Sequence, residues 1–381
     1  MKKILVVYAK YGGGHLSAAK AIQNYIENNY QDVQVEILDC VEQFNHTVNT
    51  ITTGAYKQAA KSVPWAWKHI YYDSQKKVFA ELSRGTYKVM SRKFYQYLKE
   101  FKPDVVVSTH FFGNQMVSSL KKHGKYDCKL VTVLTDFAPH KQWLIGNKYC
   151  DEYCVSNEEL KQQLIEMGLQ SWKINVTGIP LSEKFTSESL EKMRSIEGRK
   201  QICLENNLKP NKKLILFFGG GEFGLGKEST VQVLKSLCGH ISKYQIVAIS
   251  GRNKKMHSEF LKLAEEIENE DLHILEYTNQ VPELMSMASM VVTKPGGLTS
   301  SESLAAGLPI IIINPIPGQE EENAEFLEKN GAGYWIRKDD DIQAAIDSLI
   351  LNEDRLKSMS DCANKLAKRN SSKDICEIIM K

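Results

Sequence analysis

Short apolar runs alternate with longer amphipathic stretches along most of the chain. The stretches between the runs have helical periodicity, and one of them predicts a helix over residues 15–28. Strands that are apolar on both faces and alternate with helices are typical of a parallel sheet covered on both sides. The pattern therefore predicts the α/β class. The predicted strands are residues 3–9, 33–38, 104–108, 130–135, 152–155, 174–177, 214–218, 245–250, 273–276, 290–293 and 310–314.

The strand–helix theme is interrupted once, which suggests two domains. Residues 178–180 (Gly-Ile-Pro) break the pattern, and a charged helical stretch leads to the polar segment 206–213, which contains Pro210. The alternation of strands and helices then resumes with the predicted strand at residues 214–218. We predict an N-terminal Rossmann-like domain over residues 1–205 and a C-terminal one over 206–365. A last helix, residues 366–381, is expected to pack back on the N-terminal domain.

Composition narrows the class of protein. Hydrophobic residues make up 42% and charged residues 25% of the 381 residues, which excludes a fibrous or largely disordered chain. No apolar stretch reaches the ~18 residues of a membrane-spanning helix. The first apolar run, residues 4–9, is too short for a signal peptide. The eight cysteines include no CxxC pair, so we expect reduced thiols in a cytoplasmic protein.

Basic charge is concentrated in one part of the chain. Residues 57–99 contain ten Lys or Arg and only two acidic residues, whereas the whole chain carries +3. A helix over residues 77–101 would place an apolar stripe opposite the basic side chains, and we expect that stripe to pack in the core. Upstream, residues 64–72 interleave aromatic and basic side chains, as is typical of the lipid headgroup layer. These are Trp65, Trp67, Lys68, Tyr71 and Tyr72. An anionic membrane surface is therefore the predicted partner; nucleic acid is not, because no binding motif accompanies the charge.

A glycine loop follows the strand at 214–218. Residues 219–224 (GGGEFG) satisfy GxGxxG, but the next strand ends without the acid that would hold a dinucleotide's ribose. Residues 221–227 resemble a P-loop, but Glu228 stands where Ser or Thr must bind magnesium. What remains is a set of backbone N–H groups at a helix N-terminus, a favourable place for a phosphate. The alternative is a purely structural turn.

Another candidate residue is His15, in the sequence YGGGH. It stands where a helix begins, just beyond the carboxyl end of a strand, and ligands bind there in open α/β sheets. A neutral imidazole at that place could accept a proton near pH 7. The alternative is a capping or packing histidine.

Polar groups also follow the strands at 290–293 and 310–314. Glu302, in the first turn of a helix, could accept hydrogen bonds from both hydroxyls of a ribose, or could only complement the helix dipole. Gln319, Glu320 and Asn323 suit the hydroxyls of a sugar, or form a solvated acidic loop. The acids at 339–341 contain a DxD string, but they begin a surface helix, so we predict no metal site.

Several motifs stand out when they are taken together: TKPGGLTSSESLAAGLPIII, PIPGQEEENAEFL, FGGGEFGLG, SGRNKK, YGGGH, and Thr135-Asp136 followed by His140 and Trp143. As a set they resemble one family, that of monogalactosyldiacylglycerol synthases and processive diacylglycerol glucosyltransferases. The resemblance extends over residues 4–333, and the transferase that makes lipid II is a more distant relative. The family resemblance implies a GT-B fold, in which two Rossmann-like domains face across a cleft. It also implies sugar transfer with inversion and without a bound metal.

The resemblance assigns roles to individual residues. His15 matches the histidine proposed as catalytic base, with Asp136 as the alternative base or an orienting carboxylate. The acceptor side is implied to include Gly14, His140 and Trp143. The nucleotide sugar is implied to contact a set in the C-terminal domain: Gly220, Gly221, Arg252, Asn253, Gln280, Val281, Gly297, Leu298, Thr299, Glu302, Gln319, Glu320 and Asn323.

The implied activity moves glucose or galactose from UDP-glucose or UDP-galactose to diacylglycerol. The UDP-sugar is a substrate and no cofactor is expected. Because diacylglycerol stays in the bilayer, we expect a peripheral protein on the inner face of the cell membrane. Two alternatives remain open: a transferase that acts on a polyprenyl-linked cell-wall precursor, and a non-catalytic sensor of nucleotide sugars.

Overall fold

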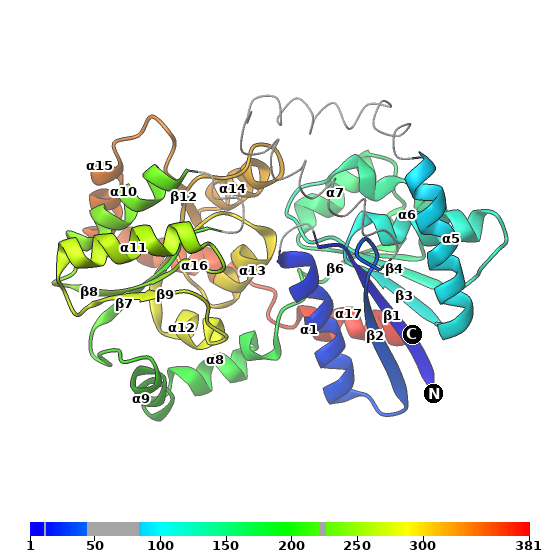
Figure 1. Ribbon diagram of the computed structural model, residues 1–381, viewed down its shortest axis with the longest axis horizontal. Helices are drawn as coiled ribbons and strands as arrows, with labels where there is room; N and C mark the ends of the chain where they lie inside the picture. Colours follow the sequence, from blue (N-terminus) through cyan, green and yellow to red (C-terminus); the bar gives the residue numbers. More distant parts are fainter. Residues whose placement is uncertain (11–12, 44–83, 221–225) are drawn as a thin grey trace. The chain divides into compact units, whose positions relative to one another are not determined.

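The computed structural model describes residues 1–10, 13–43, 84–220 and 226–381, with side chains in the helix that begins at Arg84 described from residue 92. The chain forms two compact units. The first comprises Met1–Glu183, Pro317–Gln319 and Asn370–Lys381, and the second comprises Lys184–Ile316 and Glu320–Arg369. Each unit is built on its own six-stranded sheet (Figure 1).

The first sheet is entirely parallel, with the order β2-β1-β3-β4-β5-β6. Its strands are β1 (Lys2–Tyr8), β2 (Val33–Asp39), β3 (Val105–Ser108), β4 (Lys129–Val133), β5 (Glu152–Val155) and β6 (Ile174–Val176). The chain runs outward from β1 to β2 and then returns to place β3 on the other side of β1. The strand order therefore reverses between β1 and β3.

Helices cover both faces of this sheet because its central strand is apolar on both faces. Ile4 and Val6 of β1 pack toward α1 (Gly14–Asn29) and α17 (Ser371–Met380), which lie side by side in Figure 1. Leu5 and Val7 pack into a core shared with the helices of the other face. Those helices are α5 (Arg84–Phe101), α6 (Phe111–Lys122) and α7 (Glu158–Glu166). The C-terminal helix α17 thus belongs to the first unit.

The second sheet repeats the design, with the order β12-β11-β10-β7-β8-β9, again parallel throughout. Its strands are β7 (Lys213–Phe218), β8 (Tyr244–Ile249), β9 (Leu272–Leu275), β10 (Ala288–Thr293), β11 (Ile310–Ile312) and β12 (Gly333–Trp335). The reversal in strand order lies between β7 and β10. β12 was not among the predicted strands, because its three half-buried residues form no apolar run.

The helices of the second unit also cover both faces of their sheet (Figure 1). One core joins Phe217 of β7 to Leu234, Phe260 and Ile346, which come from three different helices. The helices are α8 (Ser187–Arg194), α9 (Ile196–Glu205), α10 (Lys227–Cys238), α11 (Lys254–Ile267), α12 (Val281–Met287), α13 (Gly297–Ala305), α14 (Gln319–Lys329), α15 (Ile342–Ile350) and α16 (Glu353–Leu366). The predicted α/β class, with parallel sheets covered on both sides, is confirmed.

The two units divide between Glu183 and Lys184, earlier than the predicted boundary at 205/206. α8 and α9 belong to the second unit because they pack on α12. The guanidinium of Arg194 in α8 donates to the carbonyl of Ser286 at 3.0 Å and to that of Ala306 at 2.5 Å. The polar segment around Pro210 is a turn before β7 rather than a link between units.

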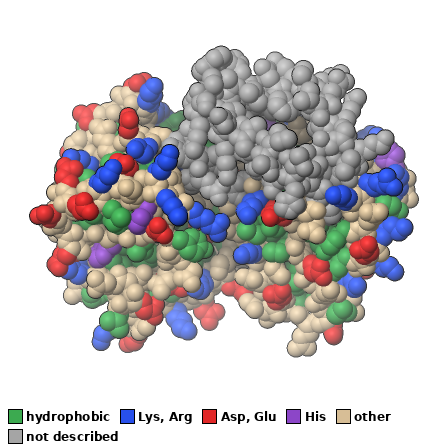
Figure 2. All heavy atoms as spheres, viewed as in Figure 1, with side chains coloured by type: hydrophobic (Ala, Val, Ile, Leu, Met, Phe, Trp, Pro, Cys, Tyr) green, Lys and Arg blue, Asp and Glu red, His purple; other side chains and the backbone are tan. Residues whose placement is uncertain are grey.

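The predicted membrane segment lies outside the described residues, and with it Trp65, Trp67, Lys68, Tyr71 and Tyr72. The described part of the basic helix shows that Phe94 is fully buried in the first core, as expected for the apolar stripe. Arg92, Lys93 and Lys99 are exposed on its surface. On the face shown in Figure 2, acidic and basic side chains are interspersed over the described residues. No helix in the described part of the chain is long and apolar enough to span a membrane.

Candidate functional site

Candidate residues gather at the carboxyl end of each sheet, at the point where the strand order reverses. In the first unit these are the segments after β1, β3 and β4. In the second unit they are the segments after β7, β10 and β11. Ligands of open α/β sheets bind in such places because the loops on either side of the reversal diverge and expose helix N-termini. Each unit is described separately below.

His15 is held by the ends of two strands. Its ring Nδ1 lies 2.7 Å from the backbone carbonyl oxygen of Thr109, which follows β3. The same nitrogen lies 3.0 Å from Oγ1 of Thr135, after β4. A carbonyl oxygen can only accept a hydrogen bond, so Nδ1 carries the proton of the neutral ring. Nε2 is then the nitrogen able to take a proton.

Burial keeps this imidazole neutral. It lowers the pKa of His15 to about 4, against the smaller opposing effect of the hydrogen bond to the Thr109 carbonyl. The ring meets that of His110 edge-on, with centroids 4.8 Å apart. Burial also lowers the pKa of His110, helped by the neighbouring His15 and His140, and lowers the pKa of His140 to about 4. The first site therefore contains a row of uncharged imidazoles at neutral pH.

Two residues predicted for the acceptor side, His140 and Trp143, lie on the loop after β4, and we call them the acceptor wall. His140 begins the 3₁₀ helix η1 (Lys141–Leu144), and its Nδ1 accepts a hydrogen bond from the Gln142 N–H at 3.3 Å. Trp143 is only 3% exposed and packs in the core. Asp136, which follows β4, is buried, and its backbone carbonyl accepts from Ser156 Oγ at 2.7 Å. Gly14 is the first residue of α1.

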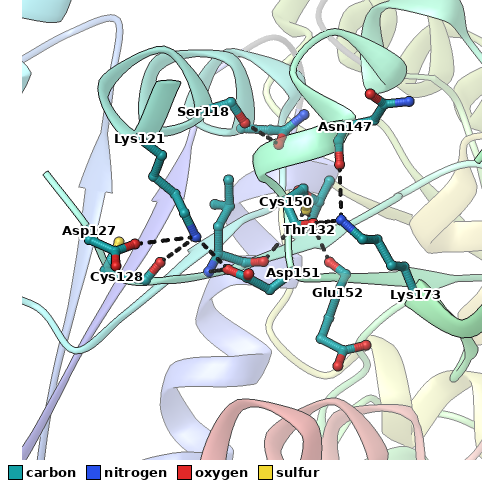
Figure 3. Close-up of polar contacts among 12 residues, drawn as sticks. Ser118, Lys121, Asp127, Cys128, Thr132, Asn147, Cys150, Asp151, Glu152 and Lys173 are labelled. Carbon is teal, nitrogen blue, oxygen red and sulfur yellow. Dashed lines mark hydrogen bonds and ion pairs between the residues drawn. The ribbon is translucent and has the colours of Figure 1, made fainter. Parts of the chain in front are cut away.

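Buried polar groups fix the loop that carries this wall. Asn114 of α6 is fully buried, and its Nδ2 donates to the carbonyls of Trp143 and Ile145, at 3.3 and 3.2 Å. Farther along the loop, Lys173 Nζ donates to the carbonyls of Cys150 at 2.6 Å and Asn147 at 3.3 Å (Figure 3). These side chains were not predicted as part of the site, since their partners are backbone atoms that leave no signal in the sequence.

The same figure shows a second lysine that ties α6 to the strand ends. Lys121 Nζ donates to Asp151 Oδ2 at 2.7 Å and to the carbonyl of Cys128 at 2.8 Å (Figure 3). Asp151 also accepts from the Leu130 N–H at 2.7 Å. The loop between β4 and β5 is thus anchored at both its η1 end and its β5 end.

In the second unit, the glycine loop after β7 approaches the segment after β10. Gly220 has φ +97°, a conformation that favours glycine. A Cβ at this position would lie 3.0 Å from Cε of Lys294, so the side chain of Lys294 lies directly against the loop. Gly221 lies outside the described residues.

The N-terminus of α13 comes next along the chain. Its N-cap residue, Gly296, has no side chain that could cap the helix. The first turn contains no acidic residue, so the predicted first-turn position of Glu302 is wrong: the helix begins at Gly297, and Glu302 lies in the next turn. The first N–H groups of a helix have no partner within it, so Gly297, Leu298 and Thr299 present donors suited to an anion. The hydroxyl of Ser300 is fully buried and has no hydrogen-bond partner within the described chain.

Burial raises the pKa of two carboxyl groups near this turn, those of Glu302 in α13 and Glu320 in α14. Glu302 is half-buried, and burial raises its pKa to about 8. Burial likewise raises the pKa of Glu320, against the opposing charge of Lys294. Glu320 Oε2 accepts from the Ile316 N–H at 2.7 Å. Asn323 is fully buried, and its Nδ2 donates to the Pro295 carbonyl at 3.0 Å.

The remaining predicted donor residues also follow strands of the second sheet. Arg252 is exposed after β8, and Asn253 caps α11 by accepting from the Met256 N–H at 3.1 Å. Gln280 caps α12, and its Oε1 accepts from Asn206 Nδ2 at 2.5 Å. The other two are half-buried first residues of helices, Val281 of α12 and Gln319 of α14. Gln319, which was predicted in the C-terminal domain, belongs to the first unit.

Metal ligands were not expected, and the described residues show no group of three or more His, Cys, Asp or Glu side chains that could hold a metal ion. All eight cysteines carry free thiols.

Comparison with known proteins identifies the family. Residues 15–181 match monogalactosyldiacylglycerol (MGDG) synthase, and residues 214–377 match the glycosyltransferase family 28 C-terminal domain. The processive diacylglycerol beta-glucosyltransferase of Bacillus subtilis (strain 168) is 30% identical over 386 residues, covering 100% of this chain and 95% of the relative. The chain belongs to the family of monogalactosyldiacylglycerol synthases and processive diacylglycerol glucosyltransferases. The predicted family is thereby confirmed.

Solved structures establish the fold. UDP-GlcNAc 2-epimerase from Neisseria meningitidis, bound to UDP-GlcNAc, matches with a TM-score of 0.68 at 16% identity, covering 99% of each chain. MurG of Acinetobacter baumannii matches with a TM-score of 0.64 at 14% identity, covering 100% of this chain and 99% of its own. The predicted GT-B architecture of two Rossmann-like domains is confirmed.

Proposed function

We propose that this chain transfers glucose or galactose from a UDP-sugar to the hydroxyl of diacylglycerol, with inversion at the anomeric carbon. The observation that carries the proposal is the hydrogen bond from His15 Nδ1 to the Thr109 carbonyl, which leaves Nε2 as a proton acceptor. The family supports the substrate class, since the Bacillus subtilis relative is named a diacylglycerol glucosyltransferase.

The reaction needs one proton transfer and one displacement. The acceptor hydroxyl gives its proton to Nε2 of His15, and its oxygen attacks the anomeric carbon from the side opposite the diphosphate. The bond from that carbon to the β-phosphate oxygen breaks, and its electron pair leaves with UDP. The Thr109 carbonyl stabilises the imidazolium that forms, because it accepts the hydrogen bond from Nδ1. Asp136 would orient the acceptor or act as the alternative base.

The second unit would hold the donor. The uncapped N-terminus of α13, with Gly297, Leu298 and Thr299, suits the diphosphate, and the loop of Gly220, which lies against the side chain of Lys294, would approach it. Glu302 would accept hydrogen bonds from the ribose. Gln280 and Val281 are assigned to the uracil, and Arg252 and Asn253 to the nucleotide site. The remaining contacts are assigned to the diphosphate (Gly221) and to the sugar (Gln319, Glu320, Asn323).

We further propose that the UDP-sugar is a substrate of a reaction without cofactor or metal, and that the protein works at the membrane surface. Transfer of diacylglycerol from the bilayer into water is unfavourable, so the enzyme must bind at the membrane surface. Residues 64–72 and the basic residues of 57–99 support binding to an anionic inner leaflet. Gly14, His140 and Trp143 would shape the acceptor side.

The test is a product assay with the full-length protein. Labelled UDP-glucose or UDP-galactose is mixed with vesicles that contain diacylglycerol, and the lipid product is isolated and its anomeric configuration determined by NMR. The expected result is a β-glycosyldiacylglycerol and free UDP. Turnover only with a polyprenyl-linked sugar acceptor, or tight binding of UDP-sugar without turnover on any acceptor, would contradict the proposal.

A further inference from the structure

A buried lysine occupies the point where the strand order of the second sheet reverses. Lys294 follows β10 directly and is only 8% exposed. Its side chain runs along the glycine loop: a Cβ built on Gly220 would lie 3.0 Å from Lys294 Cε and 3.5 Å from Nζ. The charged end of Lys294 therefore reaches the loop after β7 that the family resemblance assigns to the diphosphate.

The backbone around Lys294 is fixed. Its carbonyl accepts from the Gly296 N–H at 2.9 Å, forming the turn that leads into α13. Asn323 of α14 holds the same turn through the Pro295 carbonyl, at 3.0 Å. The lysine is thus placed between the glycine loop and the uncapped N-terminus of α13, whose partial charge is also positive.

Burial of this cation needs negative charge nearby. Desolvation lowers the pKa of Lys294, and the carboxyl group of Glu320 opposes that effect. Burial raises the pKa of Glu320, and the positive charge of Lys294 opposes that effect. A buried lysine and a helix N-terminus together make a site of positive potential that an anion would stabilise.

Other basic residues near the carboxyl end of the second sheet are not buried as Lys294 is. Lys227, at the start of α10, lies 3.2 Å from Glu259 and is 45% exposed, and Arg252 is exposed. Among the described Lys and Arg residues of the second unit, Lys294 is the one that is buried. The aliphatic part of the Lys294 side chain is enclosed by protein, and this packing fixes the position of the ammonium group.

We propose that the ammonium of Lys294 contacts the β-phosphate of UDP-sugar and stabilises the leaving UDP. The inference rests on the proposed function. When the bond between the anomeric carbon and the β-phosphate oxygen breaks, the electron pair stays on that oxygen and the diphosphate gains one negative charge. Lys294 keeps its proton and hydrogen-bonds to the oxygen. It supplies fixed positive charge where the helix N-terminus supplies only partial charge.

The test compares UDP with uridine as ligands of the full-length protein. Calorimetry is carried out on the wild type, on Lys294→Met and Lys294→Gln, and on Lys262→Met, an exposed lysine on α11. We expect both Lys294 variants to lose about 10- to 100-fold in affinity for UDP, with uridine binding unchanged. The kcat for glycolipid formation should fall more than KM for the UDP-sugar rises. Lys262→Met should match the wild type.

Failure of this inference is distinct from failure of the proposed function. Lys294 variants that keep the wild-type circular dichroism spectrum and bind UDP as tightly as the wild type would overturn the inference alone. Equal losses for UDP and uridine would also overturn it, since they would show a distorted site. A wild-type protein that binds neither ligand would overturn the proposed function, and the inference with it. If Lys294→Met does not fold, Lys294→Gln is used for the same measurements.

Discussion

The imidazole Nδ1 of His15 lies 2.7 Å from the backbone carbonyl oxygen of Thr109. The two residues are 94 positions apart and meet because β1 and β3 are neighbours in the sheet. The carbonyl fixes both the tautomer and the direction of the ring, a task that a carboxylate performs in many enzymes. Because the carbonyl is neutral, it raises the pKa of the ring less than burial lowers it.

The first prediction concerns the pH dependence of turnover. The pKa of His15 is about 4, so the imidazole stays in its basic form down to that pH. We expect kcat/KM to fall as the pH is lowered, with an apparent pKa of about 4 to 5. The measurement is initial velocity at low donor concentration across pH 4 to 8, with vesicles of fixed composition. An acid limb centred near pH 6.5, the ordinary pKa of histidine, would show that the base is exposed or is another group.

The second prediction concerns folding stability at acid pH. The folded pKa values of His15 and His140 are about 4, below the ~6.5 of an unfolded histidine. Between those values the unfolded chain binds more protons, so stability is complete above pH 6.5 and is lost as the pH falls toward 4. Thermal unfolding measured from pH 7.5 to 5 should show a falling Tm. Replacement of His140 by Gln should flatten this slope, and an unchanged slope would contradict the assignment.

The third prediction concerns Glu302, whose pKa of about 8 lies above its ordinary value. The folded state holds a proton that the unfolded state releases above pH 4.5, so this group costs stability as the pH rises from 4.5 toward 8. Glu302→Gln should therefore raise the free energy of unfolding at pH 8, by about 1–3 kcal/mol. It should also weaken UDP binding, by about tenfold, through the lost ribose contact.

The matched control for that experiment is Glu325→Gln, on the exposed surface of α14. It should change neither the Tm at pH 8 nor UDP affinity. A Glu302→Gln protein that is less stable than the wild type at pH 8 would show that the carboxyl group is charged and paired in the folded state.

The fourth prediction concerns Asn114 and the loop that carries His140. Asn114→Ala removes the hydrogen bonds from a buried amide to two backbone carbonyls, those of Trp143 and Ile145, and should lower the free energy of unfolding by about 1–3 kcal/mol. The KM for diacylglycerol should rise, while UDP affinity should stay at the wild-type value, since the donor binds the other unit. Gln162→Ala, on the exposed face of α7, is the control. Equal losses in donor and acceptor binding would contradict a specific effect on the acceptor wall.

The fifth prediction concerns membrane binding. Sedimentation with vesicles should increase with the fraction of anionic lipid and decrease with added salt. The double variant Trp65→Ser/Trp67→Ser should bind less. Trp172→Ser, which changes a tryptophan that is 69% exposed elsewhere in the first unit, should bind like the wild type. Binding that ignores both lipid charge and salt would contradict the predicted membrane segment.

The sheets could be predicted because buried parallel strands are continuous apolar runs. The helix predicted over residues 15–28 also forms, as Gly14–Asn29. β12 was missed because Gly333–Trp335 is short and half-buried. The division of the units was placed too late because the sequence does not show that Arg194 binds backbone carbonyls of α12 and of the turn after α13.

The candidate site was only partly predictable for a related reason. His15 stands out because it begins a helix after a strand and a glycine turn. Its partner is a backbone carbonyl, which every residue has, so only the strand order identifies Thr109. Lys294 was not singled out either, because a lysine in a loop usually extends into solvent. Its burial depends on the neighbouring loop of Gly220, which is distant in sequence.

The most direct test of the account is the turnover number of His15→Ala with a UDP-hexose and diacylglycerol vesicles, measured together with UDP affinity. His123→Ala is the matched control, because its Nδ1 also lies 2.7 Å from a backbone carbonyl, that of Ser119, but on the exposed surface. The account predicts a loss of about 10²- to 10⁴-fold in kcat for His15→Ala, with UDP affinity unchanged. Near-normal turnover of His15→Ala in folded protein would contradict it.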